Sequence, residues 1–195
     1  MRPSFALFVG ALGCVVAATP VVGQDSALLL EMNVGAALPM SSFADGTETG
    51  EGAESGVAFG LGFTLPRSDR VALYLGFDQQ HFGCEPAGCS DGGTYVATGF
   101  DVGVRFALLT GRTVVPWIRV TGITTRVEAR DLPDPNQGVS ELGFGFEGGV
   151  GAFIGTSRIG VNPMVTYSSV NSDLPGGDSL GLRYLTASLG LVLPF

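Results

Sequence analysis

The chain has 195 residues, enough for one domain of ordinary size. Its formal net charge is -8, an acidic balance that argues against nucleic-acid binding, because phosphate contacts need clusters of basic side chains. Only 14% of the residues are charged and 31 are glycine, which is too apolar a composition for an intrinsically disordered chain. We therefore expect one folded domain with no nucleic acid among its partners.

The N-terminus has the composition of a secretory signal peptide. Arg2 precedes an apolar run over residues 5–18, and small residues then lead to a suitable cleavage site before Gln24. This pattern predicts a signal peptide over residues 1–23 and a mature domain over residues 24–195. The alternative is an uncleaved anchor helix, because the segment after Arg2 is uncharged and just long enough to span a bilayer.

After the signal peptide the hydrophobic pattern has a period of two, which indicates β-strands. One face of each such segment carries leucine, valine and phenylalanine, and the other carries glycine, alanine, tyrosine and a few charges. The alternation is less clear in segments 114–126 and 159–169 than in the others. We expect strands at residues 28–38, 57–65, 71–78, 99–108, 114–126, 142–154, 159–169 and 185–195.

The connections between these segments alternate in length. Four of them are long, acidic and rich in glycine, whereas the other three, PRSDR, TGRT and GTSR, are short. A regular alternation of long and short connections is typical of antiparallel strands joined in hairpins. It places both ends of the chain at the end of the molecule that has the short turns.

Two kinds of closed barrel fit eight such strands, and they differ in polarity. A soluble barrel has its large apolar residues inside, whereas a membrane barrel has them outside, around a polar or small-residue interior. Glycine, alanine, tyrosine and a few charges would cover a soluble surface poorly, but they would fill a narrow interior well. We therefore predict an all-β fold, an eight-stranded antiparallel up-and-down transmembrane β-barrel.

The last strand is apolar at every second position up to the end of the chain, at Leu189, Leu191, Leu193 and Phe195. This terminus resembles the last strand of Gram-negative outer-membrane barrels, and the whole pattern is similar to the small eight-stranded barrels of the OmpA/OmpX type. The resemblance implies that the barrel-assembly machinery reads this strand. It also implies a monomer surrounded by outer-membrane lipid and lipopolysaccharide, with extracellular long loops and periplasmic termini.

Seven charged residues fall on the face predicted to point inward: Glu31, Asp78, Asp101, Arg105, Arg119, Glu147 and Arg183. Buried carboxylates and guanidinium groups are unfavourable alone, but they are stabilised when they pair and hydrogen-bond. The interior of an eight-stranded barrel is narrow enough to be filled by side chains. We therefore favour an interior plugged by a charged network over the alternative, a narrow path for ions or small solutes.

Two cysteines, Cys84 and Cys89, flank four residues in the second long loop. An exported chain meets an oxidising compartment, so we expect these cysteines to form a disulfide. A metal site that also uses His81 and Glu85 is the alternative, but its spacing matches no standard zinc pattern. We predict neither a metal nor another cofactor.

Catalysis is not expected from this sequence. His81 is the single histidine, and the small barrels that deacylate lipid A have a serine two residues after theirs, where this chain has Gly83. We expect a structural or adhesion-like role at the cell surface, with a small pore and a lipid-modifying enzyme as the alternatives. Arg126 and Arg130, on the long-loop side, are placed to meet lipopolysaccharide phosphates.

Overall fold

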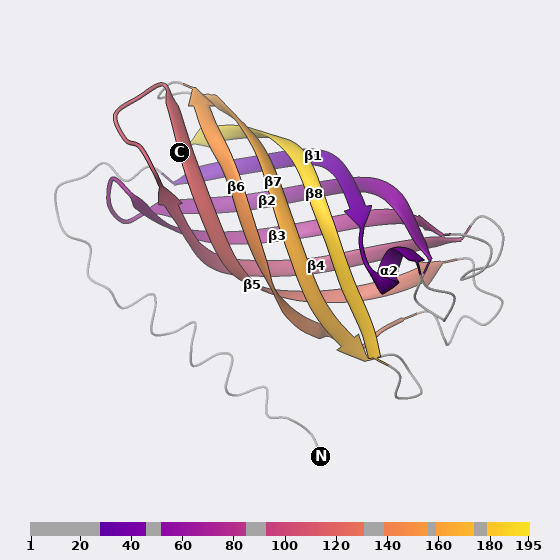
Figure 1. The fold of residues 1–195 in the computed structure, drawn as a ribbon. Coiled ribbons are helices and arrows are strands. Elements are labelled where there is room, and N and C mark those ends of the chain that lie inside the picture. Colours follow the sequence, from indigo (N-terminus) through magenta and orange to yellow (C-terminus); the bar gives the residue numbers. More distant parts are fainter. Residues whose placement is uncertain (1–27, 46–51, 85–92, 131–138, 156–158, 174–178) are drawn as a thin grey trace, which may run out of the picture.

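The computed structural model describes residues 28–45, 52–84, 93–130, 139–155, 159–173 and 179–195. The predicted signal peptide and Cys89 lie outside these residues. Within them the chain forms a closed barrel whose antiparallel strands follow the sequence order, and the last strand pairs with the first to complete it (Figure 1). The predicted eight-stranded up-and-down barrel is confirmed.

The strands are β1 (Leu29–Pro39), β2 (Ala53–Pro66), β3 (Val71–Cys84), β4 (Thr94–Ala107), β5 (Val114–Arg130), β6 (Gly143–Gly155), β7 (Gly160–Asp173) and β8 (Ser179–Pro194). One short helix, α2 (Ser42–Asp45), follows β1 at the end of the barrel that carries the long connections (Figure 1). Within the described ranges we find no helical segment with the length and hydropathy of a membrane span.

The pairing register decides which side chains share a face of the barrel wall. At the closure between β1 and β8, Glu31 pairs with Val192 and Met32 pairs with Leu191. Because successive side chains of a strand point to opposite faces, the first pair lies inside the barrel and the second lies outside. Glu31 and Val192 are buried accordingly, whereas Met32 and Leu191 are exposed.

The outer face carries a band of large apolar side chains that runs around the barrel. Val34, Phe100 and Val120, on three different strands, have exposed fractions of 55%, 61% and 60%. A monomeric soluble protein rarely exposes a contiguous apolar patch of more than a few hundred Å². A surface of this kind is stable in contact with hydrocarbon, as on the outside of a membrane barrel.

Several strands extend beyond their predicted ends on the long-loop side. β3 continues to Cys84 and β5 to Arg130. In these extensions the polarity of the two faces is reversed: on β5, Arg126 is exposed outside while the next residue, Val127, is buried inside. The apolar-outside alternation therefore ends before the strand does, which explains why the predicted boundaries were too early.

The C-terminal strand has the arrangement expected for its sequence. Leu189, Leu191 and Phe195 are exposed on the outer face, and Leu193 is partly exposed beside them. The backbone N–H of Phe195 donates to the carbonyl oxygen of Leu28 at 2.8 Å, so the chain is paired with β1 to its last residue. Its role as an assembly signal stays a prediction.

Candidate functional site

The interior of the barrel holds most of the charged residues that the sequence singled out. Six of the seven predicted residues point inward: Glu31, Asp78, Asp101, Arg105, Arg119 and Glu147. Five of these are buried, and Asp78 is partly buried. They come from five strands, β1, β3, β4, β5 and β6, and the closed sheet brings them together in one lumen.

Arg183 is the exception, and its predicted inward position is wrong. It lies on β8 between the buried residues Leu182 and Tyr184, and its own side chain is exposed on the outer face. The reason is the period of the strand, since Arg183 is an even number of residues from the outward-facing Leu189 and Leu191. It therefore belongs to the outer rim of the barrel at the long-loop end.

The first interior ion pair joins β4 to β1. The Arg105 guanidinium binds Glu31 in a bidentate manner, with Nη1 donating to Oε1 and Nη2 donating to Oε2 at 2.9 Å. The Thr64 hydroxyl donates to Oε1 at 2.5 Å, and the Asn162 amide donates to Oε2 at 2.9 Å. Asn162 in turn accepts a hydrogen bond from the indole of Trp117 at 2.9 Å. The Glu31 carboxylate is thus fully surrounded by donors, as a buried charge requires.

The second interior ion pair joins β5 to β6. Arg119 Nη2 donates to Glu147 Oε1 at 2.6 Å, and the Ser168 hydroxyl donates to Glu147 Oε2 at 2.9 Å. The guanidinium carbon of Arg119 lies 4.0 Å from the ring centre of Tyr74, and that of Arg105 lies 4.4 Å from the ring centre of Trp117. These stacked cations are held by aromatic faces as well as by carboxylates. We name the two ion pairs with Tyr74 and Trp117 the arginine layer.

The other two interior carboxylates, Asp78 and Asp101, form no ion pair with arginine among the described residues. Asp78 on β3 and Asp101 on β4 are diagonal neighbours, because Asp78 pairs with Gly99 and Asp101 pairs with Gly76. Among the described residues, neither carboxylate oxygen of Asp101 has a hydrogen-bond partner. The described residues therefore place four acidic side chains but only two guanidinium groups in the lumen, and both guanidinium groups bind glutamate.

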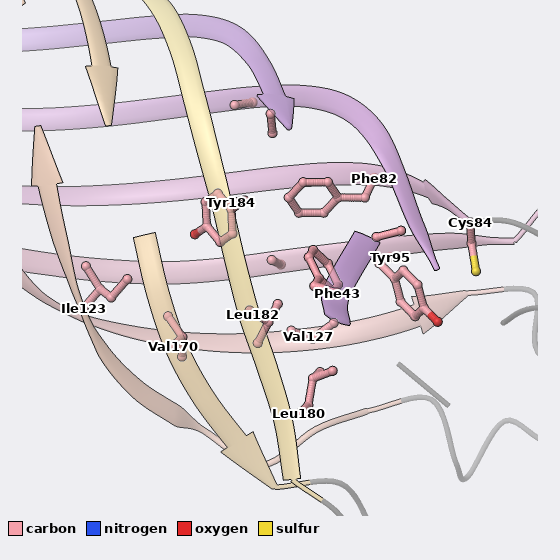
Figure 2. Close-up of a cluster of buried hydrophobic side chains, with 14 residues drawn as sticks. Phe43, Phe82, Cys84, Tyr95, Ile123, Val127, Val170, Leu180, Leu182 and Tyr184 are labelled. Carbon is pink, nitrogen blue, oxygen red and sulfur yellow. The ribbon is translucent and has the colours of Figure 1, made fainter. Parts of the chain in front are cut away.

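Apolar side chains pack inside the barrel at the long-loop end, where the sequence predicted a polar interior. Phe43 of α2 is only 1% exposed and packs edge-on against Phe82 with ring centres 5.1 Å apart (Figure 2). Phe82 contacts Tyr184 at 5.5 Å, and Tyr95 lies 6.0 Å from Phe43. We name this group the apolar plug; its other large members include Ile123, Val127, Val170, Leu180 and Leu182.

Two features of the sequence could have revealed these missed residues. Trp117 and Tyr74 have the same alternation as Arg119 and Asp78 on their own strands, so they had to share the lumen with those charges. The plug residues Phe82 and Val127 follow the inward positions beyond the point where polar residues begin to occupy the outer face. Phe43 had no such signal, since it lies in the short helix α2, outside the alternating segments.

Two small cavities lie in the lumen. A void of about 10 Å³ lies between the apolar plug and the arginine layer, with Asp101, Glu147 and Tyr184 in its wall. At the short-turn end, a bowl of about 170 Å³ is lined by Arg70, Arg105 and Trp117 among others. The described side chains therefore pack across the lumen at two levels, one apolar and one charged.

The remaining predicted residues lie away from the lumen. His81 is on the outer face of β3, where its ring is edge-on to that of Phe59 with centres 6.3 Å apart. Cys84 is buried at the end of β3, and because Cys89 is outside the described residues the disulfide stays a prediction. In the described part of the chain, no group of three histidine, cysteine or acidic side chains is arranged to hold a metal.

A closed antiparallel eight-stranded barrel with an apolar exterior and a charged lumen has the fold of the small outer-membrane barrels. The structure of neisserial surface protein A is similar, with a TM-score of 0.62 and 14% identity over 86% of this chain and 97% of that one. The structure of OprG of Pseudomonas aeruginosa has a TM-score of 0.55 and 12% sequence identity, over 88% of this chain and 98% of that one. The N-terminal barrel domain of OprF of the same organism has a TM-score of 0.51 and 14% sequence identity, over 88% of this chain and 100% of that one. Neither a protein-family model nor a curated protein matches the sequence.

Proposed function

We propose that this chain is an integral outer-membrane barrel with a structural or surface-interaction role, and that its lumen does not conduct. The observation that carries the proposal is the double closure of the lumen. An ion moving along the barrel axis would meet the desolvated apolar plug around Phe43 and then the stacked, salt-bridged arginine layer. Neither barrier opens without moving buried side chains.

The outer surface supports the membrane part of this proposal. The apolar band ends on β3 at Phe77 and on β4 at Phe100, whose rings are 5.2 Å apart. The next outward residues are Gln79 and Thr98, which share a hydrogen bond of 3.3 Å, and Arg126 beside Thr98. Aromatic side chains followed by polar ones mark a membrane interface. Outer-membrane lipid would cover the band and lipopolysaccharide its upper edge, with the long loops outside the cell and both termini in the periplasm.

The exposed arginines at this edge extend the proposal to lipopolysaccharide. Arg126, Arg130 and Arg183 all point outward on the long-loop side, although Arg130 lies 3.5 Å from Glu128. Guanidinium groups bind phosphate with two parallel hydrogen bonds. We expect them to contact the phosphates of the outer leaflet.

Conductance of the refolded barrel in planar bilayers tests the closed lumen. Because the two barriers lie in series, Phe43→Ala or Arg105→Ala alone should leave the conductance low, and the double variant should raise it clearly. Arg130→Ala, an exposed arginine outside the lumen, is the matched control. A large, steady conductance of the native barrel would contradict the proposal.

That last outcome would favour a small pore, which is the second candidate. The specific observation behind it is the excess of two carboxylates over guanidinium groups in the lumen, Asp78 and Asp101. A pore with this lining should prefer cations, so the sign of the reversal potential in a salt gradient would identify it. The Asp101→Asn variant should then reduce the preference.

We also propose that the chain is not an enzyme, since the described neighbours of His81 include no nucleophile. Its neighbours across the sheet are Val57 and Val96, and its ring faces that of Phe59. A histidine base needs a nucleophile within hydrogen-bond reach. Release of fatty acid from lipid A by the refolded protein, abolished by His81→Ala, would show that this part of the proposal is wrong.

A further inference from the structure

The acidic pair of Asp78 and Asp101 occupies the narrow zone between the apolar plug and the arginine layer. Both residues line the void of about 10 Å³, together with Gln80, Thr125 and Tyr184. Asp101 is only 2% exposed, and in the described part of the chain both of its carboxylate oxygens lack a hydrogen-bond partner. A buried ionised carboxylate without a donor is strongly unfavourable, so the two acids need a counter-charge here, either a proton or a bound cation.

The barrel makes space for these carboxylates by placing glycines beside them. A Cβ atom at Gly76 would lie 2.2 Å from Asp101 Oδ1, and a Cβ atom at Gly60 would lie 2.3 Å from Asp78 Oδ1. Any larger residue would therefore displace a carboxylate. The two acids consequently sit in a cradle that fits their side chains and holds them next to one another.

Among the described residues, neither arginine of the lumen forms an ion pair with Asp78 or Asp101. Both terminal nitrogens of Arg105 bind Glu31. Arg119 binds Glu147 through Nη2 and stacks on Tyr74, and its Nε and Nη1 are buried without a hydrogen-bond partner in the described part of the chain. Two ionised carboxylates cannot donate to each other, because both are acceptors, and one of these acids can donate to the other only when it holds a proton. Among the described residues, these two carboxyl groups of the lumen have no ion-pair partner.

We propose that this cavity binds one metal cation that prefers oxygen ligands. The groups around it offer carboxylate, amide and hydroxyl oxygens from Asp78, Asp101, Gln80 and Thr125, which is the donor set of hard cations rather than of zinc or copper. The void has room for about one water-sized body, so the ion enters largely dehydrated. Mg²⁺ keeps its waters, whereas Ca²⁺ gives them up readily and accepts irregular oxygen ligands.

The charge balance favours a divalent ion, since one such ion neutralises both carboxylates. Bound there, the ion would link β3 to β4 through Asp78 and Asp101, and the interior carboxylates outside the two ion pairs would then also have a cation beside them. This assignment goes beyond the structural role proposed above, because a non-conducting barrel does not require an internal metal.

The test uses the full mature barrel, refolded in detergent without lipopolysaccharide so that no lipid-bound divalent ions are present. Its apparent melting temperature is compared in EDTA, in CaCl₂, in MgCl₂ and in NaCl of equal ionic strength. Ca²⁺ at roughly 100 times its dissociation constant should raise the melting temperature by about 5–10 °C, and the other salts should do much less. Tb³⁺, an oxygen-seeking substitute for Ca²⁺, should emit when tyrosine is excited, because Tyr184 lines the cavity.

Asp101→Asn and Asp78→Asn are the two test variants, and Glu128→Gln is the control, since Glu128 is exposed on the outer face. In EDTA the two test variants should be at least as stable as the native barrel, because each removes one of two like charges. Both should lose the Ca²⁺ shift and the Tb³⁺ emission, whereas the control should keep them. A native barrel that Ca²⁺ does not stabilise, or a Ca²⁺ shift and Tb³⁺ emission that persist in both variants, would overturn the assignment.

Discussion

At the scale of single residues, the partners of the interior charges matter more than their number. Glu31 accepts hydrogen bonds from Arg105, Thr64 and Asn162, whereas Glu128 on the surface has only a loose contact with Arg130 at 3.5 Å. Both are glutamate–arginine pairs. Their contributions to stability should nevertheless differ widely, because burial makes an unpaired charge unfavourable while water screens an exposed one.

The Arg105→Ala substitution tests this difference. It leaves the Glu31 carboxylate buried without its cation, so the free energy of unfolding should fall by about 3–5 kcal/mol. Arg130→Ala should lower it by less than about 1 kcal/mol, because that pair is half exposed. Urea unfolding of the refolded proteins in lipid vesicles measures both values. Equal losses for the two variants would mean that the Glu31–Arg105 pair is open to water.

A second substitution separates the charge effect from the loss of packing. Adding Glu31→Gln to Arg105→Ala removes the unpaired charge but keeps the smaller side chain at residue 105. If the carboxylate is the main penalty, the double variant should be more stable than Arg105→Ala alone. A double variant that is less stable would assign the loss to the stacking of Arg105 on Trp117.

At the scale of strands, the outward residues record where the membrane ends. On β5 the outer face changes from Ile118 and Val120 to Thr124 and then to Arg126. The paired position on β4 is Thr98, which lies opposite Arg126. We infer that the hydrocarbon boundary on this side of the barrel lies between the rows of Phe100 and Thr98.

Arginine substitutions on either side of this boundary locate it. Val120→Arg should destabilise the barrel in vesicles by about 2–4 kcal/mol, because Val120 lies within the apolar band. Thr98→Arg should change stability by about 0–1 kcal/mol, since it would point into the interface. In detergent the difference in stability between the two variants should be smaller than in vesicles. If Thr98→Arg were as costly as Val120→Arg, the boundary would have to be placed nearer the long loops.

The sequence predicted the strands well only where one rule of polarity applies along their length. In the apolar band, large residues outside and small or polar residues inside identified all eight strands, including the weak segments 114–126 and 159–169. Above the band the rule reverses, and the extensions of β3 and β5 were missed together with the apolar plug. Arg183 was misplaced because its charge suggested the lumen, although its position on β8 matches the outward leucines.

In the candidate site, the position of a residue along its strand predicts which face it lies on, whereas the pairing of the strands decides which residue it contacts. Alternation alone placed Glu31, Arg105, Arg119 and Glu147 in the lumen. It could not tell that Arg105 binds Glu31 across 74 positions of sequence, while the carboxylate oxygens of Asp101 accept no hydrogen bond from a described residue. Those pairings depend on the register of all the intervening strands and on aromatic side chains such as Tyr74 that hold each guanidinium in place.

At the scale of the whole molecule, the proposed orientation has a chemical test in the second long loop. If Cys84 and Cys89 are oxidised and outside the cell, a membrane-impermeant thiol reagent should label intact cells only after reduction. The Cys84→Ser, Cys89→Ser double variant should show no labelling in either condition and serves as the control. Labelling without reductant would contradict the disulfide, and no labelling after reduction would contradict the extracellular position.

The final residue provides the last prediction, because its effects on folding and on assembly should separate. Deleting Phe195 removes one backbone hydrogen bond, to Leu28, and a side chain that is 72% exposed. The refolded barrel should therefore lose no more than about 1 kcal/mol of stability. In cells, however, the amount of protease-resistant barrel in the outer membrane should fall severalfold while export continues, if the assembly machinery reads this terminus. Phe106→Ala, which removes another exposed phenylalanine from the outer face, is the matched control and should assemble normally. Normal outer-membrane levels of the deletion variant would show that Phe195 is only one more lipid-facing side chain.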